Sequence, residues 1–412
     1  MYQGALGQAG HTGCHWPDKV RPTRRIKLGE KVSFLPILVQ IGAMQPASRI
    51  QHPGGPRPVA LPGGPLALTE RPVALPEVAV TPEAAGRYER RGILGAGAVG
   101  FVELVFDRHL GREVALKRLR PGLDGDAARR FLKEARVGAM LSHPGIVPVY
   151  ELGRRPDGGL YYTMMRVQGR TLAQALQGAE LAERLSLLPH LVAACYTLAF
   201  AHTHGVIHRD IKPDNLMLGD HGETRVVDWG LCCERGGDQS QDRPLLQALE
   251  ALRHASGTRT LVGAPIGTPA YMPPEQARGQ LSLIDARADV YAVGAILYEI
   301  LTGEPPFPGA SALHILTSVL SEPLQPPESL EPEAPRELCA IATRALAKDP
   351  AARYPDMLAL ARDLLAFRTG RVVDAHVYDR RARVQRWLVR RRAPAVALAS
   401  AVAAGTLGWW LG

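Results

Sequence analysis

The sequence predicts an α+β protein in which a lobe rich in β-strands precedes a mainly helical lobe. From Tyr88 onward, short apolar segments with β-branched residues alternate with polar positions, as at 101–106 and 113–119. After about Gly169 the apolar residues recur with the period of an α-helix. The chain has 412 residues, of which 46% are hydrophobic and 22% charged, so it can bury one or two cores and is neither wholly disordered nor a small disulfide-stabilised protein.

The first 86 residues differ in composition from the rest of the chain. Eleven glycines and twelve prolines make up about 27% of this segment, a level typical of disordered polypeptide. Its apolar stretch at 33–44 is too short to span a bilayer and contains a proline, and no basic signal-peptide region precedes it. We therefore predict a disordered tail over 1–86, with the folded part beginning near Gly86.

The two predicted lobes differ in how many helices they contain. The β-rich lobe has one predicted helix, at 127–141. The second lobe has further predicted helices at 185–203, 289–301, 311–320, 336–347 and 355–367.

The C-terminal segment has two parts of opposite character. Seven arginines and no acidic residue lie from Arg380 to Arg392. They belong to a basic segment whose limits we set at 370 and 392. Residues 393–412 carry no charge, and about 20 residues at a rise of about 1.5 Å cover about 30 Å, the thickness of a hydrocarbon core. With an arginine flank and a tryptophan pair at the far end, this pattern predicts a transmembrane helix whose basic side is cytoplasmic. A hydrophobic tail docked on protein is the alternative, because alanine adds little transfer free energy.

The net charge and the cysteines exclude some classes of function. The net charge of +9 lies in the two terminal segments, so the middle of the chain is slightly acidic and nucleic acid is not an expected partner. The five cysteines form no C-x-x-C pair. They predict neither a disulfide framework nor a zinc site, and they fit a reducing cytoplasm.

A glycine-rich turn joins two predicted strands. Gly95, Gly97 and Gly100 allow backbone N–H groups to approach a phosphate without obstruction by Cβ atoms. A strand follows this turn, whereas a dinucleotide-binding fold would have a helix there. Lys117 ends the next strand, where its ammonium group can pair with phosphates. Each of these signals is weak alone.

A second motif decides the interpretation. The sequence His-Arg-Asp-Ile-Lys-Pro-Asp-Asn at 208–215 is followed, 13 residues after its last residue, by Asp-Trp-Gly at Asp228. Asp210 can accept a hydroxyl proton from a substrate, and Lys212 can neutralise a phosphoryl group in transfer. Asn215 and Asp228 can bind Mg²⁺ through oxygen ligands.

These motifs match the protein kinase signature set. From about Arg87 to Thr369, roughly two thirds of the sequence, the chain resembles the bacterial Hanks-type (eukaryotic-like) serine/threonine protein kinases, in particular the membrane-anchored ones. The resemblance implies a bilobal protein kinase fold, with a β-rich N-lobe at 87–167 and a mainly helical C-lobe at 168–369. It also implies transfer of the γ-phosphoryl group of ATP, with Mg²⁺ or Mn²⁺, to serine or threonine of protein substrates.

The resemblance assigns roles residue by residue. Glu134 matches the helix glutamate that pairs with the strand lysine. The implied catalytic residues are Lys117, Glu134, Asp210 and Lys212, and the implied metal ligands are Asn215 and Asp228. The implied ATP contacts are Leu94, Gly95, Gly97, Gly100, Val102, Ala115, Lys117, Met165, Val167 and Met217, with Met164 as the gatekeeper.

The resemblance extends to the activation segment. Residues 267–275 match the P+1 loop and the Ala-Pro-Glu motif, and the family pattern pairs Glu275 with Arg353. Asp289 would brace the catalytic loop. Arg209, directly before the catalytic aspartate, implies that a phosphate on the activation segment orders this segment.

Two threonines are the candidate phosphosites. Thr258 and Thr260 stand a few residues before the P+1 loop with the spacing seen in bacterial relatives. We expect them to be autophosphorylated in trans, for which a homodimer is the implied partner. An unmodified, exposed pair is the alternative.

The chain departs from the family pattern at several positions. Trp229 replaces the usual phenylalanine of Asp-Phe-Gly, and Pro273 replaces alanine. Gly138 lacks a side chain where the family stacks a larger one between the lobes. We weigh two accounts: the indole of Trp229 fills the space beside Gly138, or a different neighbour does.

Three functions remain in view. The first is an active kinase, and the second is a pseudokinase that serves as a binding scaffold at the membrane. All five charged or metal-binding groups of the motif set are present, which favours the active kinase. A small-molecule kinase is less compatible with the P+1 loop. The expected location is the inner (cell) membrane, spanned once by the C-terminal helix in contact with lipid, with the kinase domain in the cytoplasm.

Overall fold

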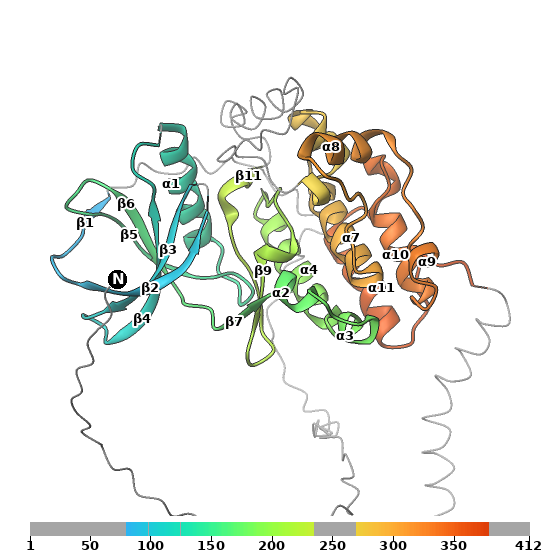
Figure 1. Ribbon diagram of the computed structural model, residues 1–412, viewed down its shortest axis with the longest axis horizontal. Helices are drawn as coiled ribbons and strands as arrows, with labels where there is room; N and C mark the ends of the chain where they lie inside the picture. The colour runs from blue at the N-terminus through green and yellow to red at the C-terminus, as the bar shows by residue number, and fades with distance from the viewer. Residues whose placement is uncertain (1–79, 98, 124, 235–268, 379–412) are drawn as a thin grey trace, which may run out of the picture. The chain divides into compact units, whose positions relative to one another are not determined.

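The computed structural model describes residues 80–97, 99–123, 125–234 and 269–378, and in this order strands come first and helices later (Figure 1). All of these residues belong to the unit Thr69–Gly412. The predicted α+β class, with a sheet-rich lobe before a helical lobe, is confirmed. The segments that we predicted to be a disordered tail and a transmembrane helix lie outside the described residues, apart from 80–86.

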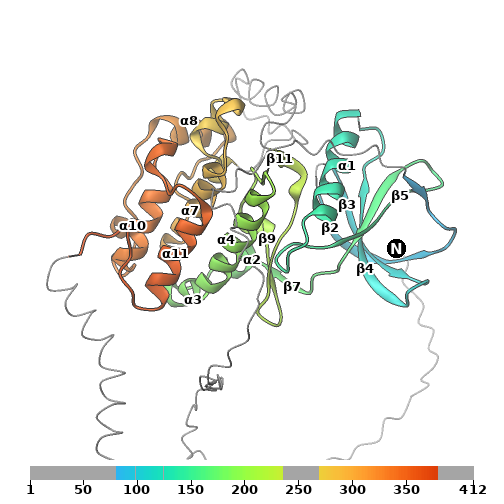
Figure 2. The same cartoon turned by 180° about the vertical axis from the view of Figure 1, so that it is seen from behind.

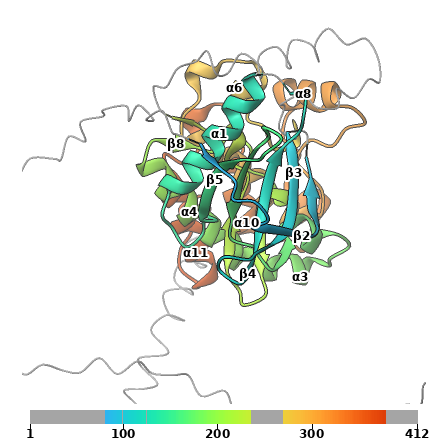
Figure 3. The ribbon, with the colours of Figure 1, turned by 90° about the vertical axis from the view of Figure 1, so that its left-hand side faces the viewer.

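A six-stranded sheet forms the N-lobe. In spatial order its strands are β1 (Thr81–Pro82), β5 (Val149–Arg154), β6 (Leu160–Met164), β4 (Arg112–Leu119), β3 (Gly100–Asp107) and β2 (Tyr88–Ala96). All neighbouring strands are antiparallel except β1 and β5. One helix, α1 (Gly125–Met140), lies beside β5 (Figure 3). Phe131 of α1 is fully buried, and its ring lies 5.1 Å from that of Tyr162 on β6, so this helix covers one face of the sheet.

Strand β1 lies inside the segment that we assigned to the disordered tail. It runs parallel to the end of β5, with Pro82 opposite Arg154, and Val80 packs against the core between α1 and the sheet. The folded part therefore includes Val80, and our boundary at Gly86 was wrong. A two-residue strand is too short to leave a periodic pattern in the sequence, and proline is tolerated at a sheet edge because its nitrogen needs no acceptor there.

The C-lobe is built from helices, with short strands at its N-lobe side. The helices are α2 (Leu172–Leu176), α3 (Leu181–Ser186), α4 (Leu188–Thr203), α6 (Pro274–Ala277), α7 (Arg287–Thr302), α8 (Ala312–Ser321), α9 (Pro327–Leu330), α10 (Arg336–Ala345) and α11 (Met357–Arg368). The strands are β7 (Gly169–Thr171), β8 (Val206–Ile207), β9 (Leu216–Gly219), β10 (Thr224–Val226) and β11 (Cys233–Glu234). Short 3₁₀ turns span Pro213–Asn215, Trp229–Leu231, Pro269–Tyr271, Leu281–Leu283 and Pro350–Ala352.

Helix α7 is the centre of this lobe. It is buried on nearly all sides and contacts α4, α10 and α11, which lie around it in Figure 2. A helix that is apolar all round is stable only where other elements cover every face. The first turn of α7 also carries Asp289, so this deeply buried helix positions a charged side chain.

One predicted helix is in fact two. The structure divides 185–203 between α3 and α4 at Leu187, and Pro189 stands in the first turn of α4. Proline has no N–H to donate and its φ suits a helix start, so the chain begins a new helix there. The stretch Leu181–Thr203 is also the one part of the described chain that is long and apolar enough to cross a membrane, and 56% of its most apolar window is buried in the lobe. It is accordingly a core element.

The C-lobe extends beyond the predicted end at Thr369. Asp363 of α11 is 4% exposed and accepts hydrogen bonds from the backbone N–H groups of Asp374 and Ala375, at 2.8 and 3.0 Å. Val373 is fully buried in the main core. The segment from 370 to 378 therefore packs on the C-lobe, and the basic segment that we placed at 370–392 starts too early. Backbone N–H groups anchor the segment 370–378 to Asp363, and the pattern of side chains in the sequence does not reveal such hydrogen bonds.

Candidate active site

The catalytic loop runs from β8 to β9 and is held by Asp289. The carboxylate of Asp289 accepts the N–H groups of His208 and Arg209, both at 2.9 Å, and the Nε2–H of His202 at 2.8 Å. Arg209 has a φ of +66°, a left-handed conformation that costs free energy for any residue with a Cβ atom. The buried aspartate stabilises this conformation directly before Asp210.

Asp210 lies at the centre of a small hydrogen-bond network. Lys212 Nζ donates to Asp210 Oδ2 at 2.9 Å. Asn215 Nδ2 donates to the backbone oxygen of Asp210 at 2.7 Å and to its Oδ2 at 3.2 Å. Burial raises the pKa of Asp210, Lys212 opposes this rise, and the nearby Asp228 adds to it. A carboxylate with a raised pKa accepts a proton more readily, as a general base requires.

A second network joins the two lobes. Lys117 Nζ lies 2.5 Å from Glu134 Oε1 and 3.4 Å from Asp228 Oδ1. Burial alone would lower the pKa of Lys117, but the carboxylates of Glu134 and Asp228 outweigh it and raise this pKa. Lys117 is therefore charged at neutral pH. The same ammonium group lowers the pKa of Asp228, which keeps that carboxylate ionised.

Tyr162 belongs to this network and was missed by the sequence analysis. Its hydroxyl donates to Glu134 Oε1 at 2.7 Å, and its backbone lies opposite Lys117 in the β4–β6 ladder. Directly opposite residues of two strands share one face of a sheet. The signal was present in the sequence, because alternation along β6 places Tyr162 on the same face as the predicted gatekeeper Met164.

Residues predicted to contact adenine lie on the face of the sheet that carries Lys117 and Tyr162. Val102 lies opposite Lys117 across β3 and β4, and Ala115 lies opposite Met164 across β4 and β6. Two-residue spacing along β4 keeps Ala115 and Lys117 on one face. The N–H of Met165 donates to Pro148 O at 3.1 Å, so this donor is already engaged within the protein.

The remaining predicted ATP contacts come from three places: β2 with the turn after it, the segment after β6, and β9. The turn after β2 is closed by a hydrogen bond from Gly97 N to Gly100 O at 2.8 Å. A Cβ atom at Gly100 would lie 2.3 Å from Arg118 O, so only glycine fits there, whereas one at Gly95 would meet nothing within 4 Å. Leu94 is half exposed on β2, Val167 follows β6, and Met217 is supplied by β9 of the C-lobe.

The predicted metal ligands fit a divalent cation that also binds phosphate. Asp228 has a 47% exposed side chain, and its contact with Lys117 is a long one. The amide nitrogen of Asn215 faces Asp210, so its oxygen is the atom that suits a metal ion. Mg²⁺ takes oxygen ligands and retains several from water or substrate phosphates, so two protein ligands are sufficient. In the described part of the chain, no group of three or more His, Cys, Asp or Glu side chains forms a metal site by itself.

Comparison with known proteins decides the family. The sequence profile described as "Protein kinase domain" matches residues 88–365. The chain belongs to the protein kinase family. It is 38% identical over 296 residues to the serine/threonine-protein kinase PknB of Mycolicibacterium smegmatis, covering 70% of this chain and 44% of that protein. It is 36% identical over 294 residues to PknB of Mycobacterium tuberculosis, with the same coverage of both chains. It is 34% identical over 294 residues to the serine/threonine-protein kinase PknD of Protochlamydia amoebophila, covering 68% of this chain and 29% of that protein. The chain thus spans less than half the length of these curated relatives.

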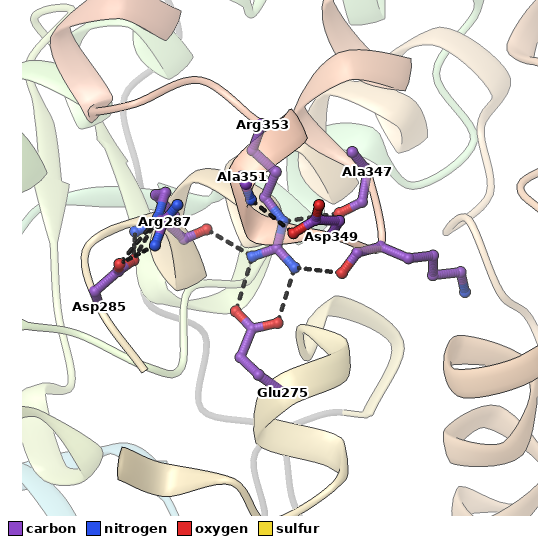
Figure 4. Close-up of polar contacts among 8 residues, drawn as sticks. Glu275, Asp285, Arg287, Ala347, Asp349, Ala351 and Arg353 are labelled. Atoms are coloured by element: carbon purple, nitrogen blue, oxygen red, sulfur yellow. Dashed lines mark hydrogen bonds and ion pairs between the residues drawn. The ribbon is translucent and has the colours of Figure 1, made fainter. Parts of the chain in front are cut away.

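In the C-lobe of this kinase, the predicted pair of Glu275 and Arg353 is formed. Two parallel hydrogen bonds of 2.8 Å join the guanidinium group to the carboxylate (Figure 4). Arg353 also donates to the backbone oxygens of Ala347 and Arg287, and its side chain is fully buried. A buried guanidinium group with this many acceptors fixes α6 against the end of the lobe.

The space beside Gly138, in the stack of side chains between the lobes, is not filled by Trp229. A Cβ atom at Gly138 would lie 2.9 Å from Cγ2 of Val149, and no atom of Trp229 lies within 4 Å of that point. Val149 therefore occupies the space, and Trp229 packs on His208 with ring centroids 4.6 Å apart. The hypothesis that the indole compensates for Gly138 is wrong, and the alternative of a different neighbour is right.

Other predicted residues are placed less completely. Thr258 and Thr260, together with the start of the P+1 loop at 267–268, lie outside the described residues.

Cys232 lies two residues after the Asp-Trp-Gly motif and is buried. Burial raises the pKa of its thiol to about 12. Its thiol therefore stays protonated at neutral pH and is chemically unreactive.

Proposed function

We propose that this chain is an active serine/threonine protein kinase that transfers the γ-phosphoryl group of ATP to hydroxyl groups of protein substrates. The observation that carries the proposal is the position of one ammonium group. Lys117 contacts Glu134 from one lobe and Asp228 from the other. This contact brings the phosphate-binding lysine and a metal-binding carboxylate together, as phosphoryl transfer requires.

The reaction follows from the charges around Asp210. A substrate hydroxyl gives its proton to the carboxylate of Asp210 while its oxygen forms a bond to the γ-phosphorus, and the bond between that phosphorus and ADP breaks. Lys212, 2.9 Å from Asp210, offers a positive charge to the phosphoryl oxygens. Lys117 would pair with the nucleotide phosphates, and Asn215 and Asp228 would hold Mg²⁺, which would neutralise phosphate charge.

A scaffold without turnover is the less favoured function. A pseudokinase has no need to keep the base, the two lysines and both metal ligands, yet this chain has all of them in bonded positions. Transfer to serine or threonine is favoured because Lys212 stands two residues after the base, and because relatives named as serine/threonine kinases are 34 to 38% identical.

Phosphoamino-acid analysis tests the proposal. The full chain is incubated with labelled ATP, Mg²⁺ and a generic basic protein, and the products are hydrolysed. We expect label on serine and threonine, in the generic protein or in the kinase itself. Label on tyrosine alone, or none in a protein that binds ATP, would contradict it.

We also propose that the chain is anchored in the cell membrane by 393–412, with the kinase domain in the cytoplasm. The arginine-rich segment that precedes 393–412 supports this topology and attracts anionic lipid. A chain that ends at Tyr378 should be found in the soluble fraction, whereas the full chain should need detergent. A full chain that is soluble without detergent would contradict the anchor.

Activation by phosphorylation is proposed for Thr258 and Thr260, on the basis of their place before the P+1 loop. Mass spectrometry of the autophosphorylated chain should find phosphate on at least one of them. Phosphate found only at other positions would reject this assignment.

Dilution of the kinase distinguishes phosphate transfer within one molecule from transfer between two molecules. Only the rate of transfer between two molecules falls as the kinase concentration falls.

A further inference from the structure

The peptide group between Arg209 and Asp210 is held by side chains at both ends. Gln276 Nε2 donates to the carbonyl oxygen of Arg209 at 3.1 Å. At the other end, the N–H of Asp210 donates to Nδ1 of His208 at 3.3 Å. The plane of this peptide group sets the direction in which the Asp210 side chain leaves the backbone. Its two holding groups therefore influence where the catalytic carboxylate lies.

The donor role of Gln276 follows from the chemistry of its partner. A carbonyl oxygen only accepts, so the NH₂ end of the amide must face Arg209. The other end, Oε1, is buried and has no hydrogen-bond partner within the described part of the chain. Gln276 is 1% exposed. An apolar side chain of the same length would fill this space without an unpaired oxygen, so packing does not account for an amide here.

Gln276 also connects two parts of the active site. It lies on α6, directly after Glu275, whose pair with the fully buried Arg353 fixes this helix. The chain that leads into α6 is the end of the P+1 loop, from Pro269 to Tyr271. The Arg209 N–H, by contrast, is held by Asp289 from α7. The strained residue before the base is thus tied to α7 through its N–H and to α6 through its carbonyl group.

We propose that Gln276 is a positioning residue for phosphoryl transfer: its amide holds the Arg209–Asp210 peptide group in place and so ties the catalytic aspartate to the helix that anchors the P+1 loop. This inference rests on the proposed kinase activity. Gln276 touches no reacting atom. Its effect should therefore appear in the rate of the chemical step and not in nucleotide binding.

The test uses two variants of Gln276 and one control in the full chain. Methionine matches glutamine in length but cannot donate, so Gln276→Met removes the hydrogen bond and keeps the volume. Gln280→Met makes the same change at an exposed position next to α6. In single-turnover and steady-state assays we expect Gln276→Met to lower kcat by about 10-fold or more, since small displacements of a catalytic group have effects of this size. The KM for ATP should stay within about twofold, and Gln280→Met should match the wild type.

A second variant separates positioning from stability. In Gln276→Glu, a protonated carboxyl group can donate to Arg209 O, whereas the ionised form repels it, and burial favours the protonated form. The rate of this variant, divided by the wild-type rate at the same pH, should therefore rise as the pH falls. The division removes the titration of Asp210, which both proteins share.

The outcomes are distinct. An active wild type with an unchanged kcat per folded molecule in Gln276→Met would overturn this inference alone. If Gln276→Met does not fold, a pH-independent ratio for Gln276→Glu would overturn it equally. An inactive wild type that binds ATP would contradict both this inference and the proposed function.

Discussion

Among single residues, Tyr162 offers the sharpest test of the lysine network. Its hydroxyl donates to Glu134 at 2.7 Å, and the adjacent Tyr161 donates to Glu151 at 3.1 Å on the opposite face of the sheet. Two neighbouring tyrosines with carboxylate acceptors thus face different parts of the N-lobe. Only one of them contacts the group that holds Lys117.

We expect Tyr162→Phe to lower kcat and Tyr161→Phe to leave it near the wild-type value. A hydrogen bond to a charged group contributes about 1.5–3 kcal/mol, so both variants should lose stability on this scale. Only Tyr162→Phe frees Glu134 to move away from Lys117. Equal kcat values for the two variants, measured at saturating ATP, would show that Tyr162 has no role in the network.

The pH dependence of the reaction follows from Asp210. The proposed base works only when deprotonated, and burial raises its pKa, so the rate should fall on acidification at a higher pH than an ordinary aspartate would give. Lys212 lowers this pKa. Its removal in Lys212→Met should therefore move the acid limb of the kcat profile to higher pH, besides lowering kcat. An acid limb that stays in place would show that another group controls it.

At this scale the sequence predicted the candidate reacting groups and the bracing role of Asp289, but not the contacts of Tyr162 and Gln276. Asp210, Lys212 and Asn215 stand in one short motif, and Lys117 with Glu134 in two more, so motif and chemistry were enough. The contact of Gln276 with Arg209 spans 67 residues and ends on a backbone oxygen. Every residue has a backbone oxygen, so the residue types in a single sequence do not reveal such a contact.

At the scale of elements, the sequence predicted long helices best. Periodic apolar positions gave α1, α7, α8, α10 and α11 with ends within a few residues of those in the structure. The helix predicted over 185–203 is two helices in the structure. Pro189 favours the start of a new helix within a stretch whose apolar residues recur with helical period. Strand β1 was missed because two residues in an edge strand carry no period.

Helix α6 depends on one buried ion pair. Glu275→Gln removes the charge that faces the fully buried Arg353, and breaking such a pair costs about 3–5 kcal/mol. Asp285→Asn is the matched control, since its pair with Arg287 lies nearby and is partly exposed (Figure 4). In urea unfolding of the full chain, Glu275→Gln should lose several times more free energy of unfolding than Asp285→Asn. Similar losses would mean that α6 is held by packing instead.

At the scale of the whole molecule, the end of the C-lobe is testable by truncation. Val373 is fully buried and Asp363 accepts two backbone N–H groups from the segment after α11. A chain that ends at Gly370 leaves the carboxylate of Asp363 without these donors, at a cost of about 1–3 kcal/mol. It should melt at a lower temperature than a chain that ends at Tyr378. Equal melting temperatures would place the end of the folded lobe at Thr369, as the sequence suggested.

The two lobes of the molecule meet through charges that come from separate motifs. Lys117 and Glu134 belong to the N-lobe, whereas Asp228 belongs to the C-lobe, and the ion pairs of Lys117 with both carboxylates exist only in the folded chain. The order of strands and helices predicted this two-lobe organisation. The extent of the lobes at both ends was not predictable, because it rests on backbone hydrogen bonds at β1 and after α11.

The central claim, that Asp210 is the base of an ATP-dependent protein kinase, is tested most directly by one comparison. Wild type and Asp210→Asn are incubated with labelled ATP and Mg²⁺, and phosphate transfer and ATP binding are measured in the same samples. Asparagine keeps the size of the side chain and cannot accept the proton, so we expect phosphorylation to be abolished while ATP binding stays nearly intact. Undiminished phosphorylation by Asp210→Asn would contradict the assignment.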